Sequence, residues 1–99
     1  MRHDFHYIRS TLSIDELLCG LAEEAAELAQ AALKYRRALT GSNPTPVSPK
    51  EAFNELLEEV ADVMLYEDML ALYLDNAQLT LIRRAKVKRW AERLREREG

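Results

Sequence analysis

The sequence has little that would interrupt a helix or cross-link the chain. Its 99 residues include one cysteine, three glycines and three prolines. Because Cys19 is the only cysteine, no disulfide can form within the chain, and a disulfide-rich secreted framework is not indicated. The first ten residues lack the apolar run of a signal peptide, and no apolar stretch is long enough to span a membrane. We therefore expect a cytoplasmic protein with no membrane partner.

Positive charge is missing from the middle of the chain. No Lys or Arg occurs between Glu51 and Thr80, whereas eight basic residues and only three glutamates lie between Arg83 and Glu98. The formal net charge of −3 gives no overall attraction to nucleic acid. Apolar residues make up 47% of the chain and charged residues 31%, which is typical of a folded protein. The length suits one domain, residues 1–99.

Capping signals and apolar spacing predict an all-α fold. Ser13 and Glu16 match a capping box, and apolar residues at helical spacing continue to about Leu39, before Gly41. This apolar stripe is centred near Leu21, Ala25, Leu28 and Ala32, which places Glu24 about 60° and Glu27 about 120° to one side. Residues 1–11 are expected to be a loosely attached segment with a short helix.

Two further helices follow residues 40–48, a predicted loop that contains a glycine and two prolines. Ser48 and Pro49 give a second start signal, and that helix should reach about Leu74. A third helix should follow a turn at Asp75–Asn76 and run nearly to the C-terminus. The second helix is apolar almost all round between Val60 and Leu74, so it needs more cover than two neighbours provide. We expect a homodimer or homotetramer to complete a helical bundle.

The segment Leu56–Leu65, LLEEVADVML, places acids among apolar residues. Glu59 and Asp62 are three residues apart, as are Glu24 and Glu27 on the preceding helix, so each pair can converge on one point. Two antiparallel helices could therefore bring four carboxylates together, and these would repel one another unless a cation lay among them. Carboxylate oxygens suit Mg²⁺ or Mn²⁺ rather than zinc. The alternative is that these glutamates are simply solvated.

Glu23-Glu24-Ala25-Ala26-Glu27 followed by Glu59-Val60-Ala61-Asp62 resembles the EExxE…ExxD signature of the MazG-like, all-α nucleoside triphosphate pyrophosphohydrolases. The resemblance covers roughly Leu12 to Leu94. It implies a bundle of that family's type, and Mg²⁺-dependent hydrolysis of a nucleoside triphosphate to the monophosphate and pyrophosphate. Removal of unwanted or non-standard nucleotides would be one use of that reaction.

The resemblance also implies roles for individual residues. By position, Glu24, Glu27, Glu59 and Asp62 would be metal ligands and catalytic residues, and Glu23 an accessory catalytic acid. Tyr66 falls where relatives place a ring near the nucleoside. Candidates for binding the substrate are Lys34, Lys86, Trp90 and Arg93. Many relatives carry an asparagine where Trp90 stands, so the preferred base does not follow from the resemblance.

Alternative functions remain open at this point. The chain could be a non-catalytic helical oligomer that binds nucleotide or a protein partner for regulation, and most of the basic C-terminal residues could be a solvated helix face. Trp90 suits a core as well as a base-stacking surface. His3 and His6 have a spacing that could ligate a metal, but they lie near a chain end. A nucleic-acid partner is not expected, because the acidic first half would repel phosphate backbones.

Overall fold

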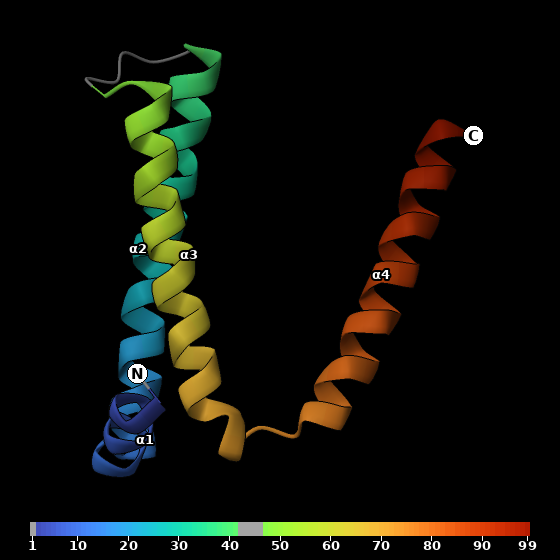
Figure 1. Ribbon diagram of the computed structural model, residues 1–99. Helices are drawn as coiled ribbons and strands as arrows, with labels where there is room; N and C mark the ends of the chain where they lie inside the picture. The colour runs from blue at the N-terminus through green and yellow to red at the C-terminus, as the bar shows by residue number, and fades with distance from the viewer. Residues whose placement is uncertain (1, 42–46) are drawn as a thin grey trace.

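The computed structural model describes residues 2–41 and 47–99, and within these ranges the protein is all-helical, as predicted. The elements are α1 (Arg2–Thr11), α2 (Ile14–Thr40), α3 (Pro49–Met69), the 3₁₀ turn η1 (Leu70–Leu72) and α4 (Asn76–Glu98). Helices α2 and α3 lie side by side and antiparallel (Figure 1), and α1 packs near the start of α2 through Phe5. We refer to the α2–α3 pair as the hairpin. It is the scaffold on which the candidate site is built.

Both ends of α2 lie where the sequence predicts them. The Ser13 hydroxyl oxygen accepts a hydrogen bond from the Glu16 backbone N–H at 3.1 Å, and the hydroxyl also lies 3.2 Å from the Glu16 carboxylate. At the other end Gly41 has φ 64°, a left-handed conformation that glycine adopts without steric cost. Its N–H donates to the Arg37 carbonyl at 2.9 Å. The Ser13 cap and the terminating glycine are therefore confirmed, whereas the Glu16 carboxylate accepts from the Ser13 hydroxyl and not, as in a full capping box, from the Ser13 backbone N–H.

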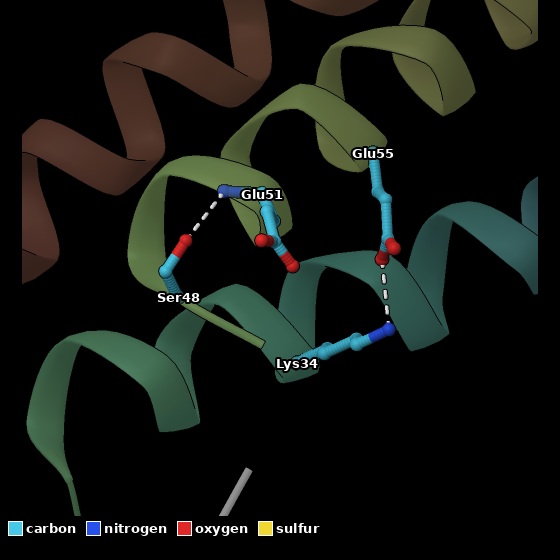
Figure 2. Close-up of polar contacts among 4 residues, drawn as sticks. All are labelled: Lys34, Ser48, Glu51 and Glu55. Carbon is cyan, nitrogen blue, oxygen red and sulfur yellow. Dashed lines mark hydrogen bonds and ion pairs between the residues drawn. The ribbon is translucent and has the colours of Figure 1, made fainter. Parts of the chain in front are cut away.

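Helix α3 begins as predicted but ends earlier. The Ser48 hydroxyl accepts from the Glu51 N–H at 3.2 Å (Figure 2), and Pro49 occupies the first turn. The prediction of an α-helix to about Leu74 was wrong, because the helix ends at Met69 and continues only as η1. There the Tyr73 N–H donates to the Leu70 carbonyl at 2.8 Å, which tightens the last turn. Residues 42–46 of the predicted loop lie outside the described residues.

Asp75 starts α4 by accepting a hydrogen bond from the Gln78 N–H at 3.0 Å. Figure 1 shows α4 diverging from the hairpin, and none of its residues is buried. Trp90 is 67% exposed within one chain, so it packs into no core there. None of the helices in the described ranges has the length and apolar character needed to cross a membrane.

A small apolar cluster joins α1, α2 and the end of α3. Leu17, Met69 and Leu70 are almost completely buried, and Phe5 of α1 packs against them. Toward the other end of the hairpin, the rings of Tyr35 and Phe53 lie 5.3 Å apart between centroids. The hairpin is thus held by apolar contacts near both ends.

The contact face of the hairpin repeats at alternating steps of three and four residues, the spacing of helices that pack as coiled coils. The buried and half-buried residues at this spacing are Leu17, Leu21, Glu24, Leu28, Ala31, Tyr35 and Ala38 on α2, Ala52, Leu56, Glu59, Val63 and Tyr66 on α3, and Leu70 in η1. The predicted centre of the α2 stripe was wrong in part, because Ala25 and Ala32 are exposed. Two glutamates therefore occupy positions that normally hold apolar side chains.

Candidate metal centre

Three carboxylates meet in the middle of the hairpin. Glu24 and Glu27 project from α2 and Glu59 from α3, and one ligand oxygen from each lies within 4.8 Å of the others. Glu24 and Glu59 are half-buried, whereas Glu27 is exposed at the rim. We call these three residues the acid group. The prediction that these two helices bring acids together is confirmed for this group.

Two oxygens of the acid group lack hydrogen-bond partners. Glu24 Oε2 and Glu59 Oε2 are shielded from solvent, and neither is hydrogen-bonded to any residue that the structure describes. Buried polar atoms in proteins are nearly always paired, because the loss of hydration is otherwise uncompensated. A cation bound between α2 and α3 would supply the missing partner of both oxygens.

Two residues of the acid group, Glu24 and Glu59, have raised pKa values. The pKa of Glu24 rises from its ordinary value of 4.5 to about 7, because the carboxyl is buried and because the Glu27 carboxyl is close. The pKa of Glu59 is also raised, again through burial first and then through the charge of Glu27. Near neutral pH, without a cation, Glu24 is therefore protonated part of the time. Both shifts have the direction expected for like charges held together.

Asp62 lies beside the acid group rather than within it. Asp62 is half-buried and lies about one turn after Glu59 on α3. Its negative charge contributes to the raised pKa values of Glu24 and Glu59. Three carboxylate oxygens, not four, meet the 4.8 Å spacing among the described residues. The predicted meeting of four carboxylates is thus met by three, and a ligand role for Asp62 remains a prediction.

The structure does not bring Glu23 to the acid group. Its side chain is exposed, and Glu23 Oε1 accepts a weak hydrogen bond from Cys19 Sγ at 3.7 Å. Tyr66, the residue that the resemblance places near a nucleoside, is half-buried and packs against the cluster of Leu17, Met69 and Leu70. In this chain its ring is thus part of the packing between α2 and the end of α3.

An open groove of about 680 Å³ extends from the acid group toward the far end of α2. Its charged lining combines four acids and two cations: Glu27, Glu55, Glu58, Glu59, Lys34 and Arg37. The Lys34 ammonium lies 2.9 Å from the Glu55 carboxylate, an ion pair between the two helices (Figure 2). Lys34 is therefore near the predicted metal ligands, but it already has a partner.

Sequence reasoning missed both Glu55 and Arg37. Glu55 is four residues before Glu59, and Arg37 is three residues after Lys34, so each follows a predicted site residue on the same helix face. Their place in the groove depends on the register between α2 and α3. The alternating three- and four-residue spacing was the available signal for that register, and it also places Glu24 and Glu59 opposite each other.

The remaining predicted residues lie away from the acid group. Lys86, Trp90 and Arg93 are exposed on α4, which diverges from the hairpin within one chain (Figure 1). His3 and His6 are exposed on α1, and His6 Nδ1 lies 3.2 Å from an Arg9 guanidinium nitrogen. Neither histidine belongs to the group of acids that could hold a metal ion.

The donor set of the acid group suits a hard divalent cation. All its ligand atoms are carboxylate oxygens, which Mg²⁺ and Mn²⁺ prefer, and no cysteine or histidine joins them within the described ranges. The exposed position of Glu27 leaves one side of the site open to the groove and to solvent. A cation held there could accept further oxygen ligands from water or from a phosphate group.

Comparison with known proteins adds no assignment: no family model, curated protein or solved structure matches the chain significantly. The resemblance to the MazG-like family thus depends on the motif residues themselves.

Proposed function

We propose that the chain is a Mg²⁺-dependent pyrophosphohydrolase that converts a nucleoside triphosphate and water to the nucleoside monophosphate and pyrophosphate. The observation that supports this most strongly is the pair of buried, unpartnered oxygens on Glu24 and Glu59, beside Glu27. An acidic centre of this kind has no affinity for a triphosphate by itself, because like charges repel. A divalent cation between protein and substrate removes that conflict.

The residues that would hold the cation are Glu24, Glu27 and Glu59, with Asp62 as the fourth ligand that the resemblance adds. Mg²⁺ or Mn²⁺, when bound, would lower the pKa of a coordinated water and offset charge that develops on the phosphoryl group. Glu24 and Glu59 come from opposite helices, so the rigid packing of the hairpin holds their carboxylates in place. The protein's part is to hold the carboxylates together and to orient the phosphates, and the bound cation would favour the deprotonated form of the carboxylates.

Cations along the groove would bind the outer phosphates. Lys34 and Arg37 follow Glu27 along α2 and line the same groove. The Lys34 ammonium lies 2.9 Å from the Glu55 carboxylate. To contact a phosphate, it must either break this ion pair or contact the carboxylate and the phosphate together. Glu23 is not among the residues that line the groove, and its carboxylate contacts Cys19, so an accessory acid role for it would need a change in its side-chain position.

A homo-oligomer forms part of this proposal. Exposed apolar side chains on α3, such as Leu57 and Met64, and on α4, such as Val87 and Trp90, lack cover in a single chain. A long helix without tertiary packing is marginally stable in water, so α4 needs a partner. A second copy that covers α4 would also give Lys86, Trp90 and Arg93 a route to a substrate, which they lack within one chain.

The competing proposal is a non-catalytic oligomer that binds nucleotide or a partner protein. The positions of Lys86, Trp90 and Arg93 favour the non-catalytic oligomer. These residues lie away from the acid group within one chain, so a single chain offers fewer contacts to a substrate. Binding of Mg²⁺ alone does not separate the two functions. Turnover does.

The deciding experiment measures pyrophosphate release from a panel of ordinary and modified nucleoside triphosphates, with Mg²⁺ and with EDTA. We expect release that requires the metal and that falls by about a hundredfold or more in Glu59→Gln, since a buried anionic ligand is lost. Glu67→Gln, an exposed change on the same helix, is the matched control and should act as the parent does. Nucleotide binding without pyrophosphate release from any member of the panel would favour the non-catalytic oligomer.

A further inference from the structure

Gly20 lies in the interior of α2, where the backbone does not require glycine. Among the described residues only Gly41 has a positive φ, so Gly20 has an ordinary helical conformation that alanine would also adopt. Glycine inside a helix is destabilising relative to alanine. Its presence there must therefore serve a contact rather than a turn.

That contact is with the ring of Tyr66. A Cβ atom built on Gly20 would overlap the far end of the ring, at Cε1, Cζ and the hydroxyl oxygen. The ring is not free to swing, because Tyr66 also packs against the buried cluster of Leu17, Met69 and Leu70. A side chain at residue 20 would thus force either the cluster to open or α3 to move away from α2.

The contact lies about one helical turn before Glu24 on α2 and about two turns after Glu59 on α3. Gly20 precedes Glu24 by four residues, and Tyr66 follows Glu59 by seven, so each shares a helix face with its acid. On the other side of the acid group, Lys34 and Glu55 join the same two helices at 2.9 Å. The acid group therefore lies between two interhelical contacts that together fix the spacing and the register of the hairpin.

We propose that Gly20 is a positioning residue for the metal centre, and that the Tyr66 ring against it sets the α2–α3 distance at which Glu24 and Glu59 converge. This inference rests on the metal site in the proposed function. It assigns Tyr66 an effect on metal binding in the absence of nucleotide. A ring that only contacted a nucleoside would have no such effect.

The test measures Mn²⁺ binding to the nucleotide-free protein, by the electron paramagnetic resonance signal of free Mn²⁺. Gly20→Ala should raise the dissociation constant by about tenfold, the size of effect usual when support around metal ligands is disturbed. Ala22→Ser adds one heavy atom at an exposed position two residues away and is the matched control, with binding like the parent's. Circular dichroism shows whether each variant keeps its helices.

A double-mutant cycle gives the sharper result. Tyr66→Leu should also weaken Mn²⁺ binding, because it leaves a gap beside Gly20. The double variant Gly20→Ala with Tyr66→Leu should bind more tightly than either single variant, since the new methyl group fills that gap. Tyr66→Phe keeps the ring and should bind as the parent does.

Parent-like Mn²⁺ binding by both single variants would overturn the proposal, as would a double variant that is no tighter than the singles. If Gly20→Ala does not fold, the comparison of Tyr66→Leu with the double variant decides. A parent that binds Mn²⁺ but releases no pyrophosphate would refute the proposed function and leave the positioning role intact. A parent that binds no Mn²⁺ would overturn both.

Discussion

Glu24 of α2 and Glu59 of α3 occupy opposing positions of the hairpin contact face, each with one oxygen buried and without a hydrogen-bond partner among the described residues. A hairpin built only for stability would hold apolar side chains at both places. The two glutamates destabilise the metal-free fold, because burial and mutual repulsion oppose their ionisation.

Divalent cations should stabilise the protein. At a Mg²⁺ or Mn²⁺ concentration about a hundred times the dissociation constant, binding to the folded state alone adds about 2.7 kcal/mol. The melting temperature should therefore rise by about 10 °C in a domain of this size. Differential scanning calorimetry with Mn²⁺ and then with excess EDTA measures the effect and its reversal. Equal melting temperatures in both conditions would contradict the acid group as a metal site.

The stability of the metal-free protein should fall as pH rises toward 8. The pKa of Glu24 is raised from 4.5 to about 7, so between these values the folded state binds more protons than the unfolded state. The stabilising contribution is complete below pH 4.5 and is lost as pH rises through about 7. The raised pKa of Glu59 acts in the same direction.

Melting curves in EDTA from about pH 5 to about pH 8 test whether the stability of the metal-free protein falls as pH rises. Saturating Mn²⁺ should oppose the decline, because the metal binds only the deprotonated carboxylates. Glu24→Gln should flatten the pH dependence in EDTA, since the group with the raised pKa is removed. A Glu24→Gln protein with the parent's pH dependence would contradict the assignment.

Glu59→Gln and Asp62→Asn should both raise the stability of the metal-free protein and lower Mn²⁺ affinity and turnover. Each change removes one negative charge from around Glu24. The stability gain should be larger for Glu59→Gln, because Asp62 lies outside the acid group. Thermal melts, Mn²⁺ titration and pyrophosphate release measure the three effects. An Asp62→Asn protein that is more stable yet fully active would exclude Asp62 from catalysis.

Changes to the two partners of the Lys34–Glu55 ion pair should have opposite effects on substrate binding. Both side chains are partly exposed, at 32% and 45%, so losing the pair should cost less than about 1 kcal/mol of stability in either case. Lys34→Gln should raise the KM for the triphosphate, because a cation in the groove is lost. Glu55→Gln should lower it, because Lys34 is released and a negative charge is removed. KM changes of the same sign would show that the pair has only a structural role.

Sedimentation should show a dimer or tetramer at micromolar concentration. The exposed apolar residues of α3 and α4 form a surface that a second copy would bury. Met64 of α3 is one of them, at 56% exposed. Met64→Glu should therefore shift the protein toward smaller species. A compact monomeric parent would contradict the predicted oligomer.

Local signals in the sequence determined where the helices begin and end. Ser13, Ser48 and Gly41 act through hydrogen bonds to residues three or four positions away, so their effects depend little on the rest of the fold. The end of α3 was less predictable, because the change from α-helix to η1 at Met69 depends on how the chain turns toward Asp75.

The paired spacing of the acids predicted that four carboxylates would meet, because helical periodicity fixes which residues share a face. The structure brings three of them together, Glu24, Glu27 and Glu59. It did not determine that Glu24 lies within the contact face, that Asp62 lies just beside the group, or that Lys34 pairs with Glu55. These depend on how α3 is rotated and shifted along α2. Packing of side chains such as Tyr66 against Gly20 sets that register, and only the tertiary structure brings such distant residues into contact.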